Sequence, residues 1–261
     1  MFPILTERFR QGHRTIRFPA GDPPKIADRF RGLPVIETAK CTADCRRCAD
    51  ACPTDAISIP DGTPRMDLGR CLFCNECAQA CPVGAIAHTQ DYRLASRTRR
   101  GLIVEGKAFT LAQALDAKAR RLFGRSLHLR QVSAGGCNAC EADINVLSTV
   151  VFDLSRFGIQ IVASPRHADG LIVTGPVTEN MHLALQKTYE ATPSPKIVIA
   201  VGACAISGGP FAGHPEQHNG VDSTVPVDLY IPGCPPHPLT ILDGILRLLG
   251  RIETEDARKA G

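Results

Sequence analysis

A repeated cysteine pattern restricts the fold of this chain more than any other feature of its sequence. Residues 45–59 read CRRCADACPTDAISI, and residues 74–88 read CNECAQACPVGAIAH. Three cysteines, a proline, an alanine and an isoleucine recur at the same positions 29 residues later. A period of this length indicates two copies of one small unit that pack against each other.

Each copy, taken with the cysteine that precedes it, has the spacing of a bacterial two-cluster ferredoxin. From Cys71 to Pro82 the chain reads C-x2-C-x2-C-x3-C-P. In this run three close cysteines hold one cluster, and the fourth, before proline, ligates the other cluster. From Cys41 to Pro53 the run is C-x3-C-x2-C-x3-C-P, and the extra residue makes Cys41 the ligand that the spacing supports least. Crossed ligation predicts two [4Fe–4S] clusters, with the ligand sets Cys41, Cys45, Cys48 and Cys81 and Cys52, Cys71, Cys74 and Cys77.

A pair of zinc sites is the alternative for these eight cysteines. Zinc proteins usually group their cysteines as separate C-x2-C pairs. This chain instead has cysteine triplets that are followed by Cys-Pro, and soft thiolates on tight loops with free backbone N–H groups suit iron–sulfur clusters. A disulfide scaffold is typical of short secreted proteins. The start of this chain, MFPILTERFRQGHR, lacks the apolar segment of a signal peptide, so we expect a cytoplasmic protein with reduced thiols.

The second half of the chain predicts an α/β fold. Short apolar runs, typical of buried strands, occupy residues 127–132, 159–162, 171–173, 197–201 and 229–231. Helical patterns fall at 144–157, 178–190 and 239–249, and we expect a further amphipathic helix from a Thr110 cap to Gly124. Alternating strands and helices favour a parallel sheet with helices on both faces. The core must be mainly aliphatic, because aromatic residues make up only 5% of the chain.

The last four cysteines are predicted to meet at one edge of this sheet. Cys137 and Cys140 form a C-x2-C pair after the first predicted strand, and Cys204 and Cys234 each follow a later one. The carboxyl ends of parallel strands share an edge, where ligands of open α/β folds bind. The start of a helix at the C-x2-C pair would also favour thiolates. We therefore predict a third [4Fe–4S] cluster, with a zinc site or unrelated thiols as the alternatives.

The chain divides into four predicted segments. Residues 1–36 contain six arginines among prolines and are expected to form an extended, basic N-terminal arm. Residues 37–92 are the α+β two-cluster ferredoxin domain, and 93–125 are a basic linker and helix. Residues 126–256 are the α/β domain with a parallel sheet and one cluster. The arginine-rich stretches are solvated faces or docking sites for an acidic partner or an anionic membrane.

Weaker features narrow the function further. The net charge of +4 is mild, and the chain has no aromatic-interleaved basic run, so we expect no nucleic-acid partner. It has neither a P-loop nor a dinucleotide-binding motif. His214 and His218 fall in a Gly/Pro-rich loop that is expected to be a solvated surface. His237, in PGCPPHP, could hydrogen-bond a cluster sulfur or contact a partner.

Four segments of the second half resemble one known family. SAGGCNACEADI, VTGPVTENM, VIAVGACAISGG and DLYIPGCPPHP are similar to the small subunit of group 4 membrane-bound [NiFe] hydrogenases, such as that of formate hydrogenlyase. A related family is the cluster-bearing B-type subunit of complex I. Over residues 1–95, FRGLPVIETAKC, LGRCLFCNECAQACP and QDYRLA resemble the separate polyferredoxin subunit of the same complexes. The chain therefore resembles a fusion of the two subunits.

The resemblance implies a flavodoxin-like fold for the α/β domain and an electron-transfer role for the whole chain. The third cluster would lie nearest a catalytic centre in a separate large subunit, so this chain would have no catalytic residues of its own. It would pass electrons through three clusters between that subunit and an external donor or acceptor. With membrane subunits, it would lie peripherally on the inner face of the cell membrane.

Two points remain open within this resemblance. A complex I-like quinone oxidoreductase is the alternative function, although that family has adjacent cysteines where this chain has the C-x2-C pair of Cys137 and Cys140. Glu141 follows that pair and is expected to be a first-turn helix acid favoured by the helix dipole. A sharper hypothesis places Glu141 at the interface with the large subunit, close to a proton path.

Overall fold

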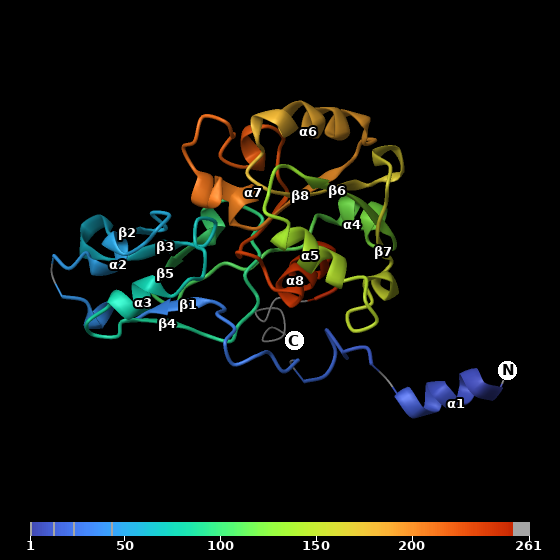
Figure 1. The fold of residues 1–261 in the computed structure, drawn as a ribbon, viewed down its shortest axis with the longest axis horizontal. Coiled ribbons are helices and arrows are strands. Elements are labelled where there is room, and N and C mark those ends of the chain that lie inside the picture. Colours follow the sequence, from blue (N-terminus) through green and yellow to red (C-terminus); the bar gives the residue numbers. More distant parts are fainter. Residues whose placement is uncertain (1, 13, 23, 43, 253–261) are drawn as a thin grey trace.

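The computed structural model describes residues 2–12, 14–22, 24–42 and 44–252. Its backbone is organised around three sheets, of which one is five-stranded and two are small and antiparallel. Figure 1 shows the small sheets on one side of the molecule and the larger sheet, with its helices, on the other.

The five-stranded sheet is entirely parallel. Its strands are β6 (Leu127–Ser133), β7 (Ile159–Ile161), β8 (Gly170–Thr174), β9 (Ile197–Val201) and β10 (Leu229–Ile231). They lie in the order β7-β6-β8-β9-β10, which is the 2-1-3-4-5 order of flavodoxin-like sheets. All five strands occur where the apolar runs predict them. The runs are continuous because a sheet covered on both faces buries every position, as in β8 and β9.

Helices cover both faces of this sheet (Figure 1). They are α5 (Ala139–Val146), α6 (Glu179–Ala191), α7 (Ala203–Ser207) and α8 (Pro238–Leu248). Side chains of the strands alternate between two cores: Ile172 and Ile199 pack with α5 and α8, and Leu171 and Val198 pack with α6 and α7. The predictions of α6 and α8 are confirmed to within one residue at each end.

Two other helix predictions are wrong in their extent. Helix α4 (Ala117–Phe123) does not start after Thr110 but after Asp116, whose side chain accepts the N–H of Ala119 at 2.9 Å. The preceding residues form a strap that backbone hydrogen bonds hold to other segments, so their apolar side chains are buried without a helix. The helical stripe expected over 144–157 ends at Val146. Residues 150 and 151 are exposed in a turn, and Asp153 adopts a left-handed φ of 47° that interrupts the helix.

The cysteine repeat of the sequence is visible in the backbone. The first copy contains helix α2 (Arg47–Asp50) and strand β2 (Ile57–Ser58). The second copy contains helix α3 (Glu76–Ala80) and strand β4 (Ile86–His88). The helix and the strand of the second copy each start 29 residues after their counterparts in the first copy, so the sequence period corresponds to a structural period.

Both strands of the repeat pair with segments outside it. Strand β4 pairs antiparallel with β1 (Pro34–Ile36), and β2 pairs with β3 (Arg65–Asp67), which pairs in turn with β5 (Ile103–Glu105). Strand β5 belongs to the stretch that the sequence predicts to be a linker. Ser96 lies in the same stretch and exchanges backbone hydrogen bonds with Tyr230 of β10, at the edge of the five-stranded sheet. Apolar side chains of the stretch, such as Leu102, are fully buried. The stretch is therefore part of the three-stranded sheet and also pairs with the five-stranded one.

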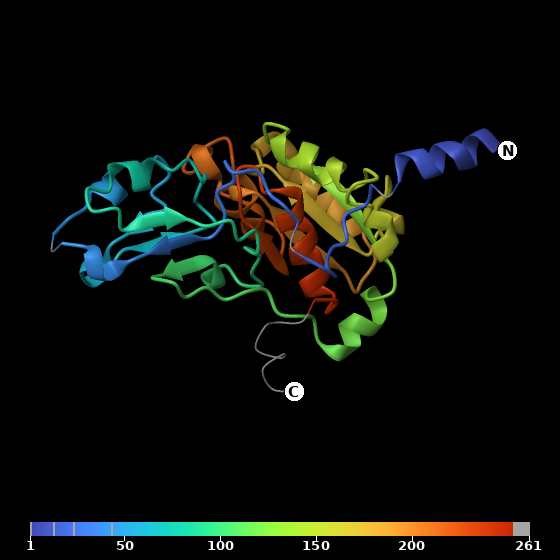
Figure 2. The ribbon, with the colours of Figure 1, turned by 90° about the horizontal axis from the view of Figure 1, so that it is seen from below.

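The N-terminal arm is not extended throughout. It begins with helix α1 (Phe2–Gln11), which points away from the rest of the molecule in both views (Figures 1 and 2). Further along, Phe18 is buried against the ring of Tyr92, at a centroid distance of 6.0 Å. No helix of the described residues is long and apolar enough to cross a membrane.

Helix α8 is buried along its whole length and carries an ion pair. Arg247 Nε lies 2.7 Å from Asp243 Oδ2, and the two side chains are only 4% and 2% exposed. Burial raises the pKa of Asp243, and the hydrogen bond and charge of Arg247 oppose that rise. Removal of either partner would leave a charge buried without compensation.

Replacement of Arg247 by Met should therefore lower the free energy of unfolding by roughly 3–5 kcal/mol. The loss should shrink as the pH falls, because a proton on Asp243 removes the unpaired charge. Urea unfolding followed by circular dichroism measures both effects. The double variant Asp243→Leu/Arg247→Met is the control, because it removes both charges and should be more stable than the single variant. Equal stability of the single variant and the wild type would contradict the prediction.

Candidate metal centres

The structure gathers the eight cysteines of the repeat around two hollows. Set I, which consists of Cys41, Cys45, Cys48 and Cys81, lines one hollow. Set II, which consists of Cys52, Cys71, Cys74 and Cys77, lines the other. Each set takes three cysteines from one copy of the repeat and one from the other copy. The structure thus brings together the same residues that crossed ligation groups in the sequence.

Backbone N–H groups point at the sulfur atoms of both sets. Cys52 and Cys81 each accept a hydrogen bond from the alanine four residues further on, with an N–S distance of 3.2 Å. Cys71 Sγ accepts the N–H of Phe73 at 3.3 Å. Such donors stabilise a thiolate and are the hydrogen bonds that tune an iron–sulfur cluster.

Two thiol groups of set II have strongly raised pKa values. Burial raises the pKa of Cys71 to about 12 and the pKa of Cys77 to about 11, and neighbouring cysteines add to both shifts. Burial also opposes ionisation of Cys81 in set I, but several backbone N–H groups lower its pKa overall. Because a metal ligand must be a thiolate, the buried cysteines of set II require a bound cation to ionise.

Set III consists of the last four cysteines, and they meet at the carboxyl edge of the parallel sheet. Cys137 lies in the loop from β6 to α5, Cys140 in α5, Cys204 in α7, and Cys234 in the loop from β10 to α8. Burial raises the pKa of Cys140, and the charges of Glu141 and of the other three cysteines raise it further. Burial, Cys234 and Cys137 likewise raise the pKa of Cys204 to about 11. The cysteines of set III come from distant segments, yet they lie close enough for their charges to raise the pKa of Cys140 and Cys204.

Glycine residues bring the backbone close to two of these sulfur atoms. A Cβ atom at Gly202, which has a φ of 91°, would lie 2.5 Å from Cys140 Sγ. A Cβ atom at Gly209 would lie 3.0 Å from Cys204 Sγ. Any larger residue at Gly202 would thus collide with a candidate ligand and would also be strained in its backbone.

Sets I and II suit a group of several atoms better than a single ion. In the part of the chain that the structure describes, no group of three or more His, Cys, Asp or Glu side chains is set to hold one metal ion. Sets I and II instead surround hollows, with N–H donors directed at their sulfur atoms. Four thiolates in such a shell are the ligands of a [4Fe–4S] cluster.

Set II lies near both of the other sets. Cys48 of set I is near enough to raise the pKa of Cys77 in set II, after burial and the nearer cysteines. Cys74 of set II likewise contributes to the raised pKa of Cys234 in set III, after burial and Cys137. Set II is therefore a neighbour of both set I and set III.

Glu141 is the buried acid beside set III, with only 5% of its surface exposed. Its Oε1 accepts hydrogen bonds from Ser133 Oγ at 2.5 Å and from Thr174 Oγ1 at 2.6 Å. These two residues end strands β6 and β8, the neighbours between which the strand order reverses. The sequence offers no pattern that singles out Ser133 or Thr174, because the contact depends on the pairing of two distant strands.

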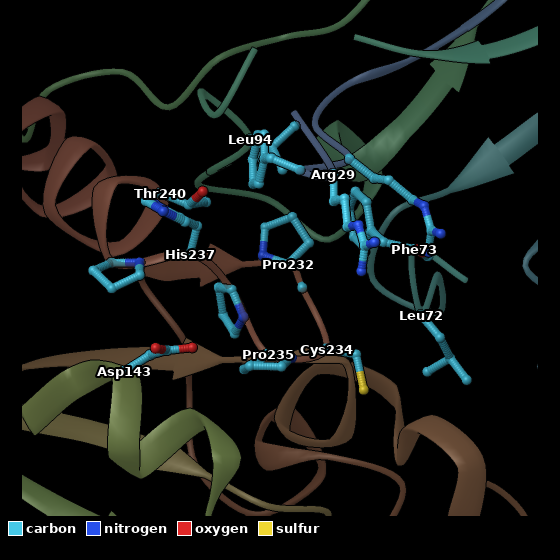
Figure 3. A pocket seen from close by; sticks show the side chains of 15 residues that line it. Arg29, Leu72, Phe73, Leu94, Asp143, Pro232, Cys234, Pro235, His237 and Thr240 are labelled. Carbon is cyan, nitrogen blue, oxygen red and sulfur yellow. Dashed lines mark hydrogen bonds between the residues drawn. The ribbon is translucent and has the colours of Figure 1, made fainter. Parts of the chain in front are cut away.

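The three histidines that the sequence singles out have structural partners. His237 lines a hollow with Cys234 (Figure 3), and its Nδ1 accepts the N–H of Leu239 at 3.1 Å, which caps α8. Burial lowers the pKa of His237. His218 Nε2 lies 2.7 Å from Glu179 Oε2, and its ring stacks on the ring of His182 at 4.1 Å. His214 Nδ1 accepts a backbone N–H from its own loop.

The cysteine sets and the parallel sheet define an iron–sulfur protein, and comparison with known proteins identifies its class. Residues 40–85 match the 4Fe-4S dicluster domain family. Residues 137–248 match the family described as NADH ubiquinone oxidoreductase, 20 Kd subunit. The first match contains all the cysteines of set I and set II, and the second contains those of set III.

Relatives along the sheet are subunits of oxidoreductases. The chain is 43% identical over 136 residues to the probable membrane-bound hydrogenase subunit mbhJ of Pyrococcus furiosus, a match that covers 52% of this chain and 81% of the relative. It is 41% identical over 160 residues to formate hydrogenlyase subunit 7 of Escherichia coli, covering 61% and 63% of the two chains. It is 43% identical over 121 residues to the B-type subunit of NADH-quinone oxidoreductase from Heliobacterium modesticaldum, covering 46% and 69%. The chain belongs to this family of 20 Kd subunits and carries a dicluster ferredoxin region before it.

The thiol groups should differ in reactivity when no metal is bound. In cluster-free protein at about pH 8, Cys71 should hold roughly a thousandfold less thiolate than Cys81, because its pKa is raised to about 12 whereas that of Cys81 is lowered. Iodoacetamide should therefore modify Cys81 long before Cys71, as measured by mass spectrometry of the digested protein. Denatured protein is the control, in which both should react at one rate. Equal rates for Cys71 and Cys81 in the native protein would contradict the prediction that burial makes Cys71 less reactive.

Proposed function

We propose that this chain is the electron-transfer subunit of a [NiFe] hydrogenase-like complex of the formate hydrogenlyase type. It would carry three [4Fe–4S] clusters, one on each cysteine set. The proximity of set II to both set I and set III is the observation that carries the proposal, because it would place the three clusters in a row from the ferredoxin region to the sheet. Each cluster, when bound, accepts and releases one electron at a time.

The residues of the chain would control where electrons enter and leave. Set I lies at one end of the row, so an external donor or acceptor would dock there. Set III lies at the other end, and Cys137 and Cys234 are exposed at the carboxyl edge of the sheet. A catalytic large subunit that covered this edge would exclude water from the third cluster and receive its electrons. The relatives that are membrane-bound hydrogenase and formate hydrogenlyase subunits support such a partner.

The remaining assignments follow from this role. The chain would have no catalytic centre of its own and would act only within a complex that also contains membrane subunits. It would lie peripherally on the cytoplasmic face of the membrane. Residues 37–92 and 126–256 would be the ferredoxin and sheet domains, although residues 93–125 contribute a strand to one and pair with the other.

A complex I-like quinone oxidoreductase is a second candidate, because the chain is also similar to the B-type subunit of an NADH-quinone oxidoreductase. The same three clusters would then deliver electrons to a quinone. The purified complex distinguishes the two functions. Hydrogen formation or uptake without quinone supports the hydrogenase, and quinone reduction without hydrogen turnover supports the alternative.

The cluster content is the direct test of the proposal. Protein purified without oxygen should contain about 12 iron and 12 sulfide ions per chain, since each [4Fe–4S] cluster holds four of each. Electron paramagnetic resonance after reduction should show interacting [4Fe–4S]⁺ signals, because adjacent clusters couple magnetically. Zinc in place of iron, together with a silent spectrum, would refute the proposal.

Gly202→Ala should remove the third cluster selectively. The new methyl group would meet Cys140 Sγ at 2.5 Å, so the thiol would be displaced from set III. The iron content should fall by about four ions per chain, while the two ferredoxin clusters remain. Gly213→Ala is the matched control, because Gly213 also has a positive φ of 81°, but a methyl group there would have no atom within 4 Å. Equal iron loss in both variants would mean that backbone strain, and not the collision with Cys140, is the cause.

A further inference from the structure

Arg31 joins the N-terminal segment to the loop that carries set II. Its Nη1 donates hydrogen bonds to the carbonyl oxygen of Phe73 at 3.0 Å and to that of Cys74 at 3.1 Å. These two carbonyl groups belong to the last two residues of the tight turn from Cys71 to Cys74, the first two cysteines of the C-x2-C-x2-C run. A single guanidinium nitrogen therefore holds both peptides of this turn.

The turn that Arg31 holds is conformationally strained. Phe73 has a φ of 55°, in the left-handed region that a bulky side chain rarely adopts. In this conformation the N–H of Phe73 points at Cys71 Sγ, at 3.3 Å. A strained conformation persists only where its surroundings hold it. The contacts of Arg31 hold the carbonyl side of the same residue, so they support the hydrogen bond to the sulfur.

Arg31 also lines a hollow that a cysteine of set III lines. Leu72, Phe73 and Cys234 line this hollow as well (Figure 3). Arg31 is bonded to the backbone of Cys74 in set II, and Cys234 belongs to set III. Arg29 lines the same hollow, but it makes no hydrogen bond or ion pair with the residues that the structure describes. The two arginines thus carry the same charge and line the same hollow, but only Arg31 is hydrogen-bonded to the turn.

We propose that Arg31 is a positioning residue that sets the reduction potential of the cluster on set II, and with it the driving force for electron transfer to set III. The inference rests on the proposed function, since it requires clusters on these sets. A fixed cation beside a cluster stabilises the reduced form, which is one charge more negative. The hydrogen bond from Phe73 to Cys71 acts in the same direction, because it withdraws charge from the ligand. Both effects raise the potential.

The test is a redox titration of the complete, cluster-loaded chain, followed by electron paramagnetic resonance. Arg31→Gln should lower the equilibrium constant for one-electron reduction of the cluster on set II by about threefold to tenfold. This is a shift of its potential by about 30–60 mV to more negative values. The other two clusters should keep their potentials. Arg29→Gln is the matched control, because it removes the same charge from the same hollow without a contact to the turn, and it should change no equilibrium by more than about twofold.

Arg31→Lys separates the charge from the geometry. Lysine keeps the cation but lacks the planar fork that a guanidinium offers to two carbonyl groups. Arg31→Lys should lower the equilibrium constant for reduction of the same cluster, but by less than Arg31→Gln does. If Arg31→Gln loses the set II cluster, this variant carries the test, and an unchanged potential in it would overturn the inference.

The remaining outcomes are also decisive. Equal shifts in Arg31→Gln and Arg29→Gln would overturn the inference, because surface charge alone would then explain them. A uniform shift of all three clusters would overturn it for the same reason. Wild-type protein without cluster signals would instead refute the proposed function itself, so the two failures can be told apart.

Discussion

The crossed grouping of the cysteines is the constraint on which the rest of the structure depends. Set I and set II each need one cysteine from the opposite copy of the repeat, so neither copy forms a complete set alone. The strands around them are only two or three residues long. Elements of this size have little stability by themselves. The chain around these sets therefore depends on both copies, and on strands β1 and β5 that are supplied from outside them.

The ferredoxin region and the large sheet are held together because the chain between them is structured. Strand β5 completes a sheet of the ferredoxin region, and Ser96 pairs with Tyr230 at the edge of the large sheet. Ser207 Oγ also donates to the carbonyl oxygen of Gly69 at 2.8 Å, which links α7 to the loop before Cys71. These contacts keep set II beside set III. A fused chain can therefore hold its neighbouring centres at a constant separation, which is what rapid electron exchange between them requires.

Much of the fold could be predicted, because its signals are local. The apolar runs predict β9 and β10 to the residue, since both strands are buried on both faces and no polar residue interrupts them. The helices were less predictable at their ends. Leu115 suits the face of an amphipathic helix, but a backbone hydrogen bond from its N–H to Leu248 buries it in a strap instead. Helix α1 has no partner among the sheets, so no core pattern in the sequence indicated it.

The sequence by itself determined the two crossed cysteine sets and the edge of the sheet at which the last four cysteines lie. Spacing suffices there, because a short loop between cysteines leaves their thiols few positions, and parallel strands end at a common edge. Only the tertiary structure decided which residues surround these thiols. The contact of Arg31 with Phe73 joins residues 42 positions apart, and Gly202, at the start of α7, approaches Cys140 in α5. Such contacts depend on how distant segments pack, and no local periodicity in the sequence encodes that packing.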